Sequence, residues 1–102
     1  MELKFDVERF NQRAAVLVSE IAQRVKFHLI QSGLQGEALE DGVSRITMSI
    51  ASLLDDLAEA EASGVAAHPY LTFRQDDETL IHCGENANTH EFVYDALKKL
   101  FG

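Results

Sequence analysis

The longest regular feature of the chain is a run of apolar residues whose spacing alternates between four and three positions. The run consists of Leu39, Val43, Ile46, Ile50, Leu53 and Leu57. Such spacing keeps one stripe of an α-helix apolar for about five turns. We predict a helix from about Leu39 to Ser63, ended by Gly64, which tolerates a left-handed backbone, and by Pro69, which cannot continue a helix.

The segment before this run carries a matching stripe. Apolar residues share one helical face between Phe5 and Gln31, among them Phe10, Ala14, Leu17, Val18, Ile21, Val25 and Leu29. Ser32 and Gly33 form a second helix stop. An exposed apolar stripe of this length must be covered, so we predict that the two helices pack together as a long helical hairpin.

Two short segments rich in β-branched and aromatic residues follow, at residues 70–74 and 79–83. The polar stretch between them predicts a β-hairpin with a two-residue turn at Asp76-Asp77. That turn would pair Phe73 with Leu80 and would place Tyr70, Thr72, Ile81 and Cys83 together on the second face of the hairpin.

The end of the chain predicts a third helix. Asn88 precedes Glu91 by three positions, as in a capping box, and apolar residues from Phe92 to Phe101 then share one side. The expected fold is a single α+β domain over residues 1–102, with element order α-α-β-β-α.

Charge and composition limit the classes of partner. The net charge of −8 argues against nucleic acid and against an anionic membrane surface, because both need clustered Lys and Arg. No apolar run approaches the ~18 residues of a membrane span, and the first residues lack a signal-peptide core. With Cys83 as the single cysteine, we expect a cytoplasmic protein without a disulfide.

Several apolar residues lie outside the predicted core stripes. Three project from the far flank of the first helix, one from the back of the second, and two from the second face of the hairpin. These residues are Val16, Phe27, Ile30, Met48, Tyr70 and Ile81. Surplus apolar surface of this kind is typical of a contact with another chain, and closed two-fold dimers are the commonest small assembly. We expect a homodimer or a protein partner to use these six side chains.

The reactive side chains gather around the hairpin in the sequence, as His68, His82, Cys83 and His90. Their spacing matches no zinc finger or ribbon, and adjacent strand residues such as His82 and Cys83 point to opposite faces. We therefore expect no metal, no cofactor and no catalytic set. The alternative that stays open is a small metal-dependent or thiol enzyme that uses these four residues.

The acidic residues suggest a second alternative. Asp55, Asp56 and Glu59 are expected on a solvated helix face, and Asp76, Asp77 and Glu78 form an acidic turn. Together they could block a basic protein surface, as an acidic inhibitor would. The interpretation that we favour is a non-enzymatic, homodimeric protein–protein interaction or regulatory module.

Overall fold

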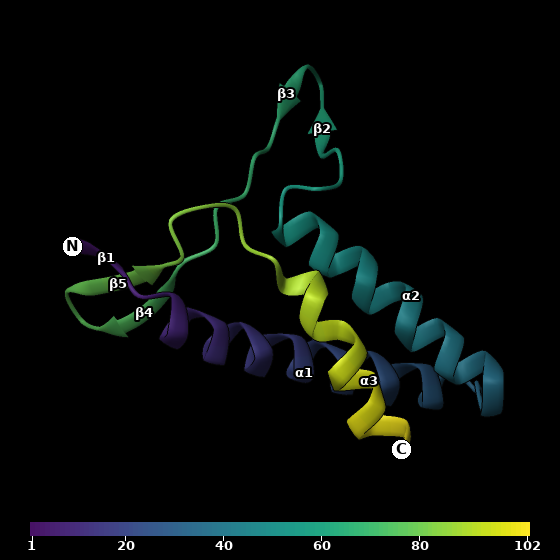
Figure 1. The fold of residues 1–102 in the computed structure, drawn as a ribbon. Helices are drawn as coiled ribbons and strands as arrows, with labels where there is room; N and C mark the ends of the chain where they lie inside the picture. Colours follow the sequence, from purple (N-terminus) through teal and green to yellow (C-terminus); the bar gives the residue numbers. More distant parts are fainter.

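The computed structural model describes all residues from Met1 to Gly102. Helices and two small sheets alternate along the chain, and they confirm the predicted α+β class and its helical hairpin (Figure 1). The elements are β1 (Glu2–Phe5), α1 (Val7–Gln31), α2 (Gly36–Leu54), β2 (Glu61–Ala62), β3 (Val65–Ala66), β4 (Phe73–Asp76), β5 (Thr79–His82), the 3-10 helix η1 (Thr89–Phe92) and α3 (Val93–Phe101).

Helix α1 begins at Val7, slightly later than predicted, because the residues before it form a strand. Asp6 caps the helix, since its carboxylate accepts a hydrogen bond from the Arg9 N–H at 3.1 Å. The helix ends as predicted at Ser32-Gly33. Gly33 has φ +95°, and the Leu34 N–H donates to the Leu29 carbonyl at 3.0 Å, which is a Schellman motif.

Helix α2 ends at Leu54, well before the Ser63 that we predicted. The same motif ends it: the Leu57 N–H donates to the Ser52 carbonyl at 2.9 Å, and Asp56 takes the left-handed position with φ 58°. Glycine usually occupies that position, but aspartate also tolerates it. The helix therefore stops at a residue that carries no glycine signal in the sequence.

The main sheet has the strand order β1-β5-β4, in which β1 pairs parallel with β5 and β4 pairs antiparallel with it. The predicted hairpin is present, but its register is wrong. Phe73 lies opposite Ile81 instead of Leu80, because the turn falls at Asp77-Glu78 and the ladder is irregular between Arg74 and Asp76.

The turn of this hairpin is fixed by a side chain. The Glu78 N–H donates to the Asp76 carboxylate at 2.9 Å. This bond is the main cause that lowers the pKa of Asp76 below its usual value, with Thr79 and Lys4 acting in the same direction.

Strand β1 is absent from our sequence-based prediction. Glu2–Phe5 alternates charged and apolar residues, but the partner strand, β5, lies far along the chain. The pairing brings Gly84, just after β5, against the Phe5 side chain. Gly84 has φ +83°, and a Cβ there would lie 2.6 Å from Phe5 Cε2.

Between α2 and β4 the chain forms a narrow arm that projects away from the helices (Figure 1). Its strands β2 and β3 form a short antiparallel ladder. The turn at Ser63-Gly64 has φ values of 52° and 79°, the combination of a type I′ turn. Residues that we predicted to continue α2 therefore lead into and form this arm.

The core lies where α3 crosses α1 and α2 (Figure 1). Its larger cluster contains Val18, Ala22, Leu39, Val43, Ala51, Val93 and Ala96. A smaller cluster of Phe10, Ala14 and Ala87 joins α1 to the sheet, and Phe10 packs edge-to-face on Phe73. The predicted apolar run on α2 is thus only partly covered: Leu39 and Val43 are buried, whereas Ile46, Leu53 and Leu57 are exposed.

The molecule is flat. Its extents are 45 × 36 × 22 Å and its radius of gyration is 15.2 Å, whereas a compact domain of this length has a radius of about 13 Å. A thickness of 22 Å corresponds to two layers of helices, since packed helix axes lie about 8–10 Å apart. No helix is both long and apolar enough to cross a bilayer.

The contact between Gly84 and Phe5 makes a prediction about the parallel strand pair. We expect Gly84→Ala to lower the free energy of unfolding by about 2–3 kcal/mol. The new Cβ would displace the Phe5 ring, and this cost adds to that of placing an alanine in the left-handed conformation. Gly33→Ala is the matched control, since it also has a positive φ but open space around it, and should cost about 1–2 kcal/mol. Urea unfolding measures both.

A double-mutant cycle identifies the cause. In a Phe5→Ala background, the cost of Gly84→Ala should fall to that of Gly33→Ala, because the clash is gone. If the cost is the same with and without the Phe5 ring, β1 does not lie where the structure places it.

Candidate functional site

The most concentrated polar interactions lie where the end of α2 meets η1, in a polar centre formed by Asp55, Thr89 and His90. Asp55 and Thr89 are fully buried. Asp55 Oδ1 accepts hydrogen bonds from the Thr89 N–H at 2.8 Å and from the Thr89 hydroxyl at 2.7 Å. Asp55 Oδ2 accepts from the His90 N–H at 2.9 Å, and His90 Nδ1 lies 2.7 Å from the same oxygen.

Asp55 thereby caps a helix that begins 34 residues later in the chain. The first N–H groups of a helix lack partners within the helix, and a carboxylate satisfies them well. We predicted that Asn88 would supply this cap. It does occupy the position, but its side chain donates to Glu91 Oε2 at 2.9 Å instead, and the carboxylate comes from α2.

The prediction that Asp55 lies on a solvated acidic face is therefore wrong. The chain leaves the helix at this residue, and the left-handed Asp56 that follows directs it away. The neighbouring carboxylates follow the expectation more closely: Glu59 is exposed, and Asp56 is partly exposed beside His68.

An aspartate beside a histidine can serve catalysis when the histidine also reaches a nucleophile. The Thr89 hydroxyl does not provide one, because it is buried between Asp55 and the Ala51 carbonyl oxygen, 3.1 Å away. The Cys83 thiol donates to the Glu85 carbonyl at 3.1 Å. The polar centre therefore joins the end of α2 to η1.

The four reactive side chains from the sequence do not come together. Each has a separate neighbour: His68 lies 3.2 Å from Asp56, and His82 Nδ1 lies 2.7 Å from the Tyr70 hydroxyl. Cys83 and His90 have the partners given above. No group of three His, Cys, Asp or Glu residues is placed to hold a metal ion.

The predicted contact residues divide into two groups. Five of them are exposed, with exposed fractions of 64% for Val16, 54% for Phe27, 49% for Ile30, 41% for Met48 and 44% for Tyr70. Ile81 is fully buried, so its assignment to an outer surface is wrong. Its pairing with Phe73, one residue away from the predicted register, turns Ile81 towards the helices.

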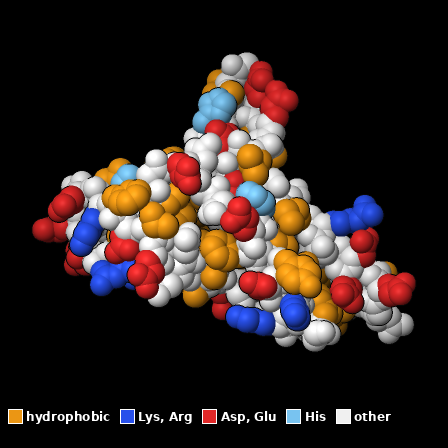
Figure 2. Space-filling view, viewed as in Figure 1, with side chains coloured by type: hydrophobic (Ala, Val, Ile, Leu, Met, Phe, Trp, Pro, Cys, Tyr) orange, Lys and Arg blue, Asp and Glu red, His pale blue; other side chains and the backbone are white.

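Further exposed apolar residues were not expected from the sequence. Leu3 and Phe5 of β1 and Val65 of the arm are more than half exposed, and so is Tyr94 of α3. Figure 2 shows apolar side chains scattered over the face that carries α3, interrupted by acidic and basic ones. The alternating pattern of Glu2–Phe5 could have identified β1, but nothing in the sequence indicates which of its faces stays open.

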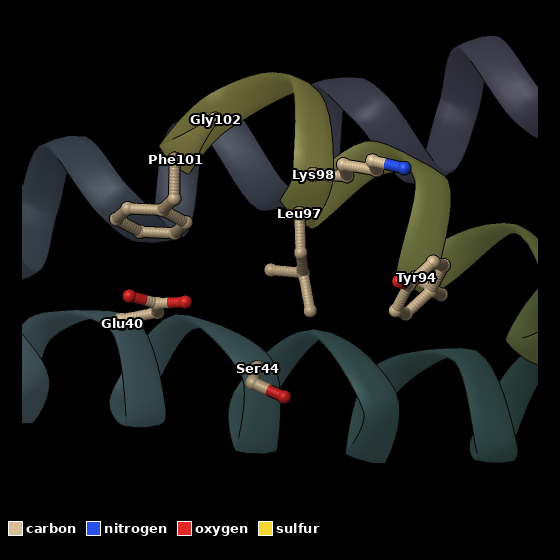
Figure 3. Close-up of a pocket in the computed structure, with 7 residues that line it drawn as sticks. All are labelled: Glu40, Ser44, Tyr94, Leu97, Lys98, Phe101 and Gly102. Atoms are coloured by element: carbon tan, nitrogen blue, oxygen red, sulfur yellow. The ribbon is translucent and has the colours of Figure 1, made fainter.

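A shallow groove of about 300 Å³ runs between α2 and α3. Glu40 and Ser44 line one wall, and Leu97 and Phe101 project from α3 towards them (Figure 3). Lys98 points away from the floor. The groove holds neither a histidine nor a cysteine, and it has no convergent polar set that would orient a small molecule.

Comparisons of the chain with models of known protein families, with curated proteins and with solved structures found no match.

The polar centre makes a prediction about stability. We expect Asp55→Ala to lower the free energy of unfolding by about 3–5 kcal/mol, because it leaves the N–H groups of Thr89 and His90 buried without an acceptor. Asp56→Asn is the matched control, since it changes the adjacent, partly exposed carboxylate and should cost less than about 1 kcal/mol. Equal losses in chemical unfolding would show that Asp55 does not act as the cap.

Two buried threonines allow a test with one kind of substitution. The Thr47 hydroxyl is buried in α2 without a hydrogen-bond partner, whereas the Thr89 hydroxyl bonds to Asp55. We expect Thr47→Val to raise the free energy of unfolding by about 1 kcal/mol and Thr89→Val to lower it by about 1–2 kcal/mol. Loss of stability in Thr47→Val would reveal an unrecognised partner of that hydroxyl.

Proposed function

We propose that this protein is a non-enzymatic protein–protein interaction module that acts as a homodimer. The observation that carries the proposal is the amount of surface that the single chain leaves open. Its accessible surface is 6784 Å², whereas a compact monomer of 11.4 kDa exposes roughly 5,800 Å². This excess of about 1,000 Å² of exposed surface agrees with the small number of residues that the core buries completely.

The nature of the excess surface supports binding to protein. Val16, Phe27 and Ile30 lie along one flank of α1, and Met48 and Tyr70 add further exposed apolar side chains. A single exposed apolar residue has little meaning, but three on one flank of a helix form a stripe that a partner can cover.

The two alternatives have less support. An enzyme would need His68, His82, Cys83 and His90 to converge, and each of them has its own neighbour. An acidic inhibitor would lose Asp55, which is buried. The single cysteine supports a reducing compartment, and we propose the cytoplasm as the place of action.

The test uses an environment-sensitive hydrophobic dye on the folded, full-length chain. We expect the wild type to increase the dye's fluorescence and Phe27→Gln to reduce that increase, with less than about 0.5 kcal/mol change in unfolding free energy. Tyr94→Gln is the matched control, because Tyr94 is also an exposed aromatic residue but lies outside the proposed contact set.

One outcome supports the proposed function and another contradicts it. A reduction in Phe27→Gln alone supports a contact surface on the flank of α1. A folded wild type that is monomeric and leaves the dye fluorescence unchanged contradicts the proposed function.

A further inference from the structure

One side of the layer formed by α1 and α2 is covered by α3. On α1 this side carries Ala15 and Ser19, which line a depression against α3, and Lys26, whose Nζ donates to the Leu100 carbonyl at 3.1 Å. On α2 it carries Glu40 and Ser44, which face α3 across the groove (Figure 3).

The opposite side of the same layer carries a different set of residues. Two positions along a helix correspond to a rotation of about 200°, so the residues two places after Ala15, Ser19, Ser44 and Ala51 point away from α3. Those residues are Leu17, Ile21, Ile46 and Leu53, and Ile50 lies between the last two. We call these five residues the open face.

The open face is apolar and poorly covered. Ile46 is 39% exposed and Leu53 is 40% exposed. Leu17, Ile21 and Ile50 are half-buried, but none of the three packs against either buried cluster. The molecule is only two helix layers thick, and α3 already forms the second layer.

The charge of the open face suits a second copy of this chain. With a net charge of −8, two copies repel each other wherever carboxylates meet. The five residues carry no charge, His28 lies on the same side two places after Lys26, and Ser49 lies beside them on α2. At the margin on α1, Glu20 forms an ion pair with Arg24 at 3.8 Å. Because this carboxylate is paired with an arginine, two open faces can approach without bringing it unpaired against the other copy.

The surface of the whole chain leaves room for such a contact. A stable interface of standard size buries about 800 Å² on each partner. The chain as a whole exposes about 1,000 Å² more than a compact monomer of its mass, so an interface of this size would bring its exposed surface close to that of a compact fold.

We propose that a second copy covers the open face. The two α1–α2 layers pack face to face around a two-fold axis and form a four-helix bundle, with α3 of each copy on the outside. This inference rests on the proposed function, but it assigns dimerisation to the open face and leaves the flank with Val16 and Phe27 free for a different partner.

The test is the native mass of the full-length protein by size-exclusion chromatography with light scattering. We expect the wild type at twice 11.4 kDa and Ile46→Lys at 11.4 kDa, because a buried, unpaired lysine in the interface is costly. Val16→Lys is the matched control: it places the same charge on an exposed apolar position outside the open face and should stay dimeric. Circular dichroism checks that both variants are folded.

Each outcome distinguishes this inference from the proposed function. A dimer that Val16→Lys breaks and Ile46→Lys does not would overturn the assignment to the open face but keep the interaction module. A monomeric wild type that still binds the hydrophobic dye would overturn both the open-face assignment and the homodimer, and would keep only the interaction surface on the flank of α1.

If Ile46→Lys fails to fold, two further measurements test whether the open face forms the dimer. Leu53→Lys, also on the open face, should again give the monomer mass. The wild-type melting temperature should rise over a ~100-fold increase in protein concentration, as for any dimer whose folding is coupled to association. A melting temperature that does not change with concentration would overturn the inference.

Discussion

The fold depends on one buried carboxylate. Asp55 ends α2 and at the same time caps the helical segment that begins at Thr89, so it connects the helical hairpin to the last third of the chain. A carboxylate without partners would be strongly destabilising in this position, but here it accepts hydrogen bonds from two backbone N–H groups and one hydroxyl. The crossing of α3 over α1 and α2, on which the larger core cluster depends, starts from this point.

This way of building the domain leaves one side of it thin. Because α3 is fixed to one side of the α1–α2 layer, its apolar residues cover only that side. The sheet covers the start of α1 through Phe10, and the arm projects away from the helices. An apolar run that continues past the region covered by the chain itself is typical of helices that complete their packing with a second chain.

The sequence predicts those elements whose signals are local. The 3.6-residue periodicity identifies both long helices, and Gly33 marks the end of the first. Prediction from the sequence fails where an element depends on a partner far along the chain, or where a residue other than glycine takes a left-handed conformation. The cap of η1 comes from Asp55, β1 pairs with a strand far along the chain, and α2 ends at a left-handed Asp56 instead of a glycine. The one-residue error in the hairpin register came from the irregular ladder near Gln75 and moved Ile81 from the surface to the core.

The same distinction explains which parts of the candidate site could be found. An exposed apolar residue off the core stripe is visible from periodicity alone, and Val16, Phe27 and Ile30 are indeed exposed. A reactive residue acquires a role only through its neighbours, and those neighbours are set by the fold. His90 and Asp55 looked unrelated in the sequence but are hydrogen-bonded in the structure, whereas His82 and Cys83 are adjacent in the sequence but have separate partners. The hydrogen bonds of Asp55 with Thr89 and His90 hold the end of α2 against η1, and exposed apolar side chains lie elsewhere, on α1, α2 and β1.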